Sequence, residues 1–143
     1  MNNFLKYFFL GVFFWFIVDF TTTEAIRNPG QYYSAFMPAL LIFYIGYPLV
    51  FSLLIYKLKL SNKSLLFATL IGAFIVEILF THNTLLYTPP LMIITIPIAI
   101  SIYSLLTFVP KWIVEREIKN NKWKLRILLI VYLLVSIATL FGK

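Results

Sequence analysis

Five apolar stretches, separated by short polar segments, run the length of the chain. They occupy about residues 4–20, 38–56, 64–84, 91–109 and 125–141. Each is close to the roughly 20 residues that a helix needs to cross the hydrocarbon of a bilayer. Because lipid offers the backbone no hydrogen-bond partner, such stretches are expected to be helical. The pattern predicts an all-α, polytopic integral membrane protein, with residues 1–143 forming a single membrane domain, a bundle of five transmembrane helices.

Prolines mark the breaks in this pattern. Pro48 and Pro97 fall inside two of the stretches and predict kinks, since proline lacks the N–H that a helix interior needs. Pro110 is predicted to end the fourth stretch, and Asn28-Pro29-Gly30 has the composition of a turn. Pro38 suits the first turn of its helix, where a missing N–H does no harm.

The distribution of basic residues predicts the orientation in the membrane. Ten of the twelve Lys and Arg fall in the N-terminal segment and in the loops that follow the second and fourth stretches. The other side receives only Arg27 and Lys143. Cytoplasmic loops are enriched in Lys and Arg, so the N-terminus is predicted to be cytoplasmic and the C-terminus outside. The expected location is the cell membrane, with several passes.

Composition agrees with lipid as the main solvent. The chain is 62% hydrophobic and 12% charged, against about 25% charged in soluble domains. The net charge of +7 arises from short loops and not from a basic stripe on a soluble helix, so nucleic acid is not an expected partner. There is no Cys, which excludes disulfides, thiolate metal sites and Cys nucleophiles. No cofactor motif is present, and none is predicted.

Two acidic residues lie within apolar stretches. Asp19 shares a helical face with Gly11, Trp15 and Thr23 by the spacing of four. Glu77 likewise follows a face of small and polar residues, Thr69 and Ala73, that continues to Thr81. A carboxylate in the membrane costs about 2.5–3.5 kcal/mol unless it finds a partner, so both should face protein.

The outer half of the predicted bundle collects the candidate chemistry. Asp19 and Glu77 are the candidate acid–base pair, with His82 as a third catalytic candidate. An unpartnered Glu77 would take up a proton and could serve as a ligand or proton site. The other residues predicted for that ligand or proton site are Glu24, Thr81 and Asn83.

The alternative for Glu77 is a structural hydrogen bond to a neighbouring helix, for example to Thr95 or Ser136. Glu24 and Arg27 are spaced to form a surface ion pair of little energetic value. No spacing of acidic residues and His82 is diagnostic of a metal, and no metal site is predicted.

The loop after the fourth stretch carries a cluster of six basic residues. These suit anionic lipid headgroups, and a purely topological role is the alternative. The predicted headgroup ligands are Lys111, Arg116, Lys119, Lys122, Lys124 and Arg126. Trp112 and Trp123 flank this loop as expected interfacial anchors.

Three functions fit these features. The first is a non-catalytic subunit or accessory component of a larger membrane complex, because the chain has almost no soluble mass and no recognisable catalytic motif. Its partners would be membrane lipids and either other membrane subunits or further copies of itself. The second is a membrane-embedded enzyme acting on a lipid or isoprenoid substrate through Asp19 and Glu77. The third is a proton-coupled transporter or channel with Glu77 as the protonated site.

Overall fold

The computed structural model describes residues 1–23 and 37–142, with side chains of α3 described from Leu41 onward. Residues 24–36 and 143 lie outside the described part of the chain. The predicted turn at residues 28–30 and the candidate residue Glu24, with its expected partner Arg27, therefore lie outside the described residues.

The described residues form five α-helices, as the all-α prediction requires. Two of them begin at a side-chain cap, since Asn2 accepts from the Leu5 amide at 2.9 Å and Ser61 from the Ser64 amide at 3.2 Å. A π-helix and two 3₁₀ turns complete the secondary structure. In chain order the elements are α1 (Asn3–Thr22), α3 (Met37–Tyr56), α4 (Asn62–Phe74), η3 (Ile75–Phe80, the π-helix), η4 (Thr84–Leu86), α5 (Met92–Val114), η5 (Ile118–Asn121) and α6 (Lys122–Phe141).

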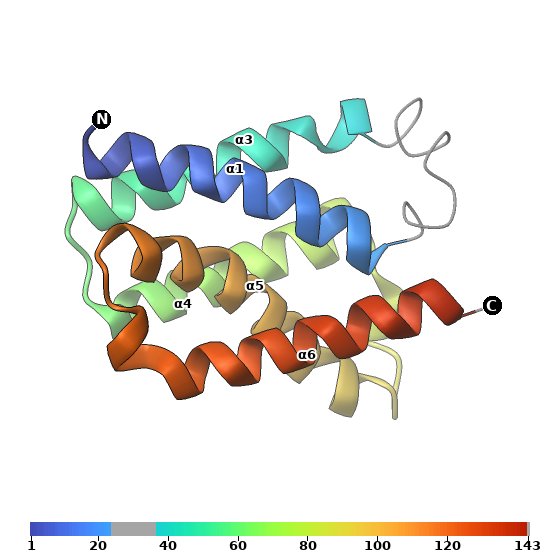
Figure 1. Ribbon diagram of the computed structural model, residues 1–143. Helices are drawn as coiled ribbons and strands as arrows, with labels where there is room; N and C mark the ends of the chain where they lie inside the picture. The colour runs from blue at the N-terminus through green and yellow to red at the C-terminus, as the bar shows by residue number, and fades with distance from the viewer. Residues whose placement is uncertain (24–36, 143) are drawn as a thin grey trace.

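The helices form a bundle in which α5 is central, in contact with α1, α4 and α6, while α1 also packs on α3 and α6. The N- and C-termini lie at opposite ends of the bundle (Figure 1). Four of the helical segments are long and apolar enough to cross a membrane: Asn3–Thr22, Asn62–Phe80, Met92–Val114 and Ile118–Phe141. The described side chains of α3, Leu41–Tyr56, form a shorter apolar helix.

Two predicted helix ends are wrong. Pro110 does not end α5, which continues to Val114. Eight consecutive residues around Pro110, from Leu105 to Trp112, are buried, and their packing outweighs the cost of about 3 kcal/mol for an internal proline. Trp112 is therefore in the core, 5% exposed, and not an interfacial anchor; Trp123 is 69% exposed.

The helix predicted over residues 64–84 ends at Phe80 instead. From Ile75 it runs as a π-helix, and Thr81–Asn83 connect it to η4 without helical structure. In this connection His82 has a positive φ of 50°, a conformation that few non-glycine residues adopt. The π-helix changes which side chains share a face, so Thr81 is exposed and leaves the stripe that begins with the buried Thr69 and Ala73.

The core combines aromatic packing with a buried hydrogen-bond network. Thr107 of α5 is its centre: Thr69 donates to its hydroxyl at 3.1 Å, the Tyr47 hydroxyl lies 2.8 Å from the same oxygen, and Tyr7 donates to its carbonyl at 3.0 Å. These four residues come from α5, α4, α3 and α1, and all are buried. The network ties four helices together at one depth of the bundle.

Candidate functional site

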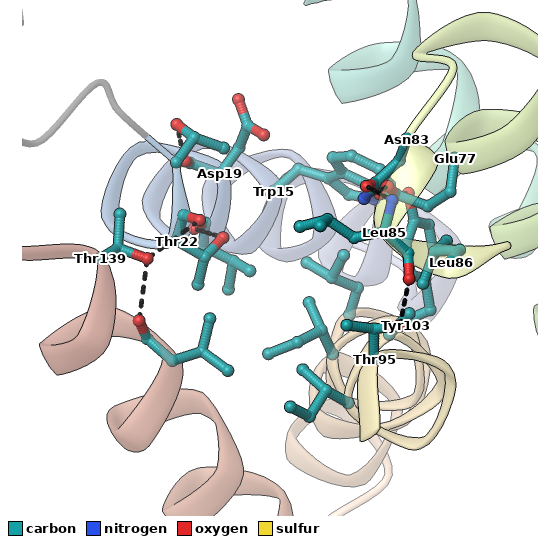
Figure 2. Close-up of a pocket in the computed structure, with 17 residues that line it drawn as sticks. Trp15, Asp19, Thr22, Glu77, Asn83, Leu85, Leu86, Thr95, Tyr103 and Thr139 are labelled. Carbon is teal, nitrogen blue, oxygen red and sulfur yellow. Dashed lines mark hydrogen bonds between the residues drawn. The ribbon is translucent and has the colours of Figure 1, made fainter. Parts of the chain in front are cut away.

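A cavity of about 350 Å³ lies at the end of the bundle where α1 ends and α5 begins. Its walls come from α1, η3, η4, α5 and α6, together with the connection before η4. Both intramembrane acidic residues predicted from sequence, Asp19 and Glu77, line it. In Figure 2 the side chain of Trp15 extends from α1 toward Glu77 and Asn83, with Asp19 farther along the same helix. We call this space the dicarboxylate cavity.

Asp19 lies one turn before the end of α1. Its side chain accepts a hydrogen bond from the hydroxyl of Tyr44 on α3. Tyr44 is buried and its ring packs against Trp15 and Phe16 of α1, so its orientation is fixed by the contact between the two helices. The α1–α3 packing thus holds the Asp19 carboxylate at the cavity wall.

Glu77 lies within the π-helix and has two partners. Tyr103 of α5 donates to Oε1 at 2.8 Å, and the Asn83 amide donates to Oε2 at 2.8 Å. Both carboxylate oxygens of Glu77 therefore accept a hydrogen bond. Neither partner is one of the two residues suggested from sequence: Thr95 donates to the Leu85 carbonyl at 2.6 Å, and the Ser136 hydroxyl has no hydrogen-bond partner among the described residues.

The π-helix is what brings Asn83 to Glu77. Two backbone hydrogen bonds follow it: the Thr81 N–H donates to the Val76 carbonyl at 2.9 Å, and the Asn83 N–H donates to the Glu77 carbonyl at 2.8 Å. The chain therefore folds back against the end of the π-helix, which places Asn83 beside Glu77. The Thr81 hydroxyl bonds to the Glu77 carbonyl at 2.9 Å and does not line the cavity. Single π-helical turns are rare and frequently occur at functional sites.

Trp15 contributes an unusual donor. Its indole is 5% exposed and packs against three tyrosine rings, with centroids 6.1 Å from Tyr44, 5.1 Å from Tyr47 and 5.7 Å from Tyr103. The indole Nε1–H is buried and has no acceptor among the described residues. A buried donor without an acceptor costs about 1–3 kcal/mol, so this indole N–H lowers the stability of the bundle unless a group outside the described residues accepts from it.

The charged side chains in the described walls of the cavity are all acidic. Its described walls contain two acidic side chains and no Lys, Arg or His. The remaining polar groups of the described walls are the hydroxyls of the four Thr residues and of Tyr103, the Asn83 amide and the Trp15 indole; the other lining residues are aliphatic. The two described partners of the Glu77 carboxylate, Tyr103 and Asn83, are both uncharged donors.

The cavity is closed toward the middle of the bundle. Trp15 and Tyr103 form its inner wall, and Tyr47 packs against both rings. Beyond them lies the buried Thr107 network, in which Thr69 and Thr107 have no exposed surface. These buried side chains separate the cavity from the middle of the bundle.

The other predicted site residues lie apart from the cavity. His82 is exposed and lines neither the dicarboxylate cavity nor any other hollow described below. Of the six basic residues predicted to bind headgroups, five have exposed side chains. The sixth, Lys111, is 8% exposed and forms an ion pair with Glu115 at 2.6 Å. Glu117 lies 3.9 Å from the same ammonium group.

Sequence reasoning missed the two tyrosines that hold the carboxylates. Tyr44 and Tyr103 lie in stretches so rich in aromatic residues that nothing distinguishes them from lipid-facing rings. A spacing argument also works within one helix only, whereas each tyrosine reaches its carboxylate from another helix. Trp15 was on the predicted face with Asp19, but its unpaired donor depends on three-dimensional packing.

No known family model, curated protein or solved structure matches the chain. Among the described residues, no three or more acidic or His side chains are grouped as a metal ion would require. The chemistry of the cavity must therefore be argued from its own residues.

Proposed function

We propose that the chain is a small multi-pass membrane protein that binds a proton or a small organic cation in the dicarboxylate cavity, as the binding step of a proton-coupled carrier. The observation that carries this proposal is that Asp19 and Glu77, from α1 and η3, line one cavity whose described walls hold no basic side chain. An intramembrane ionisable residue is a functional candidate by default, and here two share one space.

Electrostatics favour a cation in this space. A carboxylate in a weakly screened cavity attracts a proton or an ammonium group more strongly than it would in water. Tyr44, Tyr103 and Asn83 already orient the two carboxylates by hydrogen bonds. Because these side chains are already ordered, the entropic cost of arranging them around a bound cation is small.

The closed inner wall favours a carrier over a channel. The Trp15 and Tyr103 rings and the Thr107 network would have to separate before a bound cation could continue through the bundle. A carrier changes conformation in this way, whereas a channel needs a continuous path. Pro48 and the π-helix are the irregularities at which α3 and the α4–η3 segment can bend.

The orientation that we propose places the cavity in the outer half of the membrane and the N-terminus in the cytoplasm. Its support is the charge asymmetry of the loops, with ten of twelve basic residues on one side. The exposed basic residues between α5 and the first turns of α6 would then lie at the inner leaflet, beside anionic headgroups.

Flux in proteoliposomes tests the proposal. With purified protein and an internal pH-sensitive dye, an imposed pH gradient should dissipate faster than in empty liposomes. Glu77→Gln and Asp19→Asn remove one cavity charge each and should each reduce the protein-dependent rate at least about tenfold, the loss of roughly 1.4 kcal/mol of stabilisation.

The matched control is Glu117→Gln, which removes a carboxyl group from beyond the other end of α5, where Glu117 lies 3.9 Å from the Lys111 ammonium group. It should keep the wild-type rate. A flux that is the same in Glu77→Gln, Asp19→Asn and the wild type would rule out the proposed cation site.

The enzyme and subunit hypotheses stay predictions. An enzyme would use the same two carboxylates as acid and base, and it requires that one of them hold a proton while the other does not. A subunit would add contacts on the bundle surface, and α6, which has no buried residue among those described, offers the most surface for them.

A further inference from the structure

A separate pocket of about 420 Å³ lies between α4, α5 and α6, at the end of the bundle opposite the dicarboxylate cavity. The starts of α4 and α6 and the C-terminal end of α5 meet there (Figure 1). The pocket shares no lining residue with the dicarboxylate cavity. We call it the basic-end pocket, because Lys63 and Lys124 line it. Its volume is within the roughly 300–1,000 Å³ that is usual for ligand sites.

The outer part of the basic-end pocket is polar and positively charged. Lys63 is the second residue of α4 and Lys124 is the third residue of α6, so each ammonium group comes from the first turn of a helix. Asn62 and Asn121 line the pocket beside them and add amide donors. The partial positive charge of a helix N-terminus has the same sign as the two lysines. This part of the pocket therefore favours an anion.

The two lysines have no counter-ion within the described protein. No acidic side chain is among the described walls of the pocket. Glu115 and Glu117, which precede η5, lie 2.6 Å and 3.9 Å from the Lys111 ammonium group instead. Lys63 and Lys124 are exposed, and neither forms an ion pair with a described residue. Their charge is therefore balanced by an anion from outside the chain, and anionic lipid supplies one at the membrane surface.

The inner part of the basic-end pocket is apolar apart from one hydroxyl. Trp112, Phe108 and Ser104 follow one another at intervals of four residues, so they line one face of α5 over about 12 Å. Leu66 of α4 and Leu128 of α6 lie about one turn beyond the two lysines. The walls thus change from charged to apolar within about one helical turn, which is the arrangement that an amphiphile with an anionic head requires.

We infer that the basic-end pocket binds one anionic phospholipid. Its phosphate lies between the ammonium groups of Lys63 and Lys124, and one acyl chain lies along the face of α5 that carries Phe108 and Trp112. A free phosphate would leave the apolar walls uncovered. A zwitterionic lipid would bring a further ammonium group to a site that has no described acid to pair with it. The inference goes beyond the proposed cation site and does not depend on it.

Native mass spectrometry of the purified protein in a mild detergent tests this inference, because it resolves the binding of each successive lipid molecule. The probes are phosphatidylglycerol and phosphatidylcholine, each with two oleoyl chains. The first phosphatidylglycerol should bind at least about tenfold more tightly than the first phosphatidylcholine, which carries no net charge. Equal affinities for the two lipids would overturn the assignment of an anionic head.

The charged part of the pocket is tested by a pair of double variants. Lys63→Gln with Lys124→Gln should weaken binding of the first phosphatidylglycerol at least about tenfold. Lys57→Gln with Lys59→Gln is the matched control, because both residues are exposed in the connection between α3 and α4 and neither lines the pocket. It should keep the wild-type affinity. An equal loss in the two double variants would show that lipid binds through the summed charge of this end, and would overturn the site.

The apolar part is tested by filling it. Ile127 of α6 lines the pocket and is 40% exposed, so Ile127→Trp can place a bulky ring there and should weaken phosphatidylglycerol binding at least about tenfold. Ile130→Trp is the matched control, because Ile130 lies on the same helix, is 56% exposed and does not line the pocket. It should keep the wild-type affinity. Circular dichroism reports that both variants are helical, and an unchanged affinity in Ile127→Trp would overturn the place of the acyl chain.

Discussion

At the scale of single residues, Trp15 places a polar group in the core without a described partner. Tryptophan is a donor only, so its buried N–H requires an acceptor, and none of the described residues supplies one. The three tyrosine rings around the indole prevent it from rotating to find one elsewhere.

Replacing Trp15 by Phe tests the cost of this N–H. The variant keeps an aromatic ring in the core and removes the unpaired donor, whose burial costs about 1–3 kcal/mol, so the free energy of unfolding should stay close to the wild-type value. Unfolding in mixed detergent micelles measures the change. A loss of more than about 2 kcal/mol would show that the N–H contributes to stability.

The residue scale also shows which members of the cavity wall the sequence could single out and which it could not. Asp19 and Glu77 could be singled out because charge in an apolar stretch is conspicuous and helical spacing gives it a face. Their hydrogen-bond partners Tyr44 and Tyr103 could not, since pairing between helices depends on how the helices cross. His82 was conspicuous for the same reason as the acids, yet it lies exposed outside the cavity.

At the scale of elements, the crossing of α1 and α3 positions Asp19. The two helices approach so closely at Gly11 that a Cβ placed there would lie 2.7 Å from Pro48 Cβ. Small residues permit such close packing between membrane helices, and here the small residue faces a proline that also bends its helix. The contact fixes how far along the helix axes Tyr44 lies from Asp19, because Tyr44 is one turn before Pro48.

This contact predicts opposite outcomes for two Gly→Ala substitutions. Gly11→Ala should destabilise the bundle by about 1–3 kcal/mol, since neither the added methyl nor the proline ring has room to move. Gly46→Ala, in α3, meets no atom within 4 Å and should be neutral or slightly stabilising. Unfolding in mixed detergent micelles measures both, and equal stability of the two variants would contradict the close contact.

The elements also explain the two helix ends that sequence did not predict. A Pro in a helical pattern usually ends the helix, but the burial of the whole segment around Pro110 keeps α5 helical to Val114. The π-helix over Ile75–Phe80 escapes a search for repeats of four, because each of its turns holds more residues than an α-helical turn. Both differences from the predicted helices depend on packing between helices, which the local sequence pattern does not show.

At the scale of the whole molecule, the two ends of the bundle differ in chemistry. The end with the dicarboxylate cavity is acidic, and the end that holds the α3–α4 and α5–α6 connections is basic. The N-terminus and the C-terminal end of α6 lie at opposite ends of the bundle (Figure 1). In a membrane this polarity would fix the orientation of the protein and expose the cavity to one aqueous side.

Cysteine labelling tests this orientation directly, because the chain has no cysteine of its own. Thr84→Cys lies at the acidic end and Lys119→Cys at the basic end, and both positions are exposed. A membrane-impermeant maleimide applied to intact cells should label Thr84→Cys alone, and Lys119→Cys should react only after permeabilisation. The reverse pattern would invert the proposed topology.

The dicarboxylate cavity has one wall that is held less firmly than the others. Val135 and Thr139 of α6 line it, yet α6 has no buried residue among those described. It is joined to α1 near the cavity by two hydrogen bonds, Thr21 to Tyr132 at 2.7 Å and Thr139 to the Thr22 carbonyl at 3.4 Å. A helix with so few buried contacts can open locally at a small cost in free energy, while the Thr107 network keeps the other helices in place. The residence time of a bound molecule would then depend on the rate at which α6 opens locally, and not on the strength of the carboxylate contacts alone.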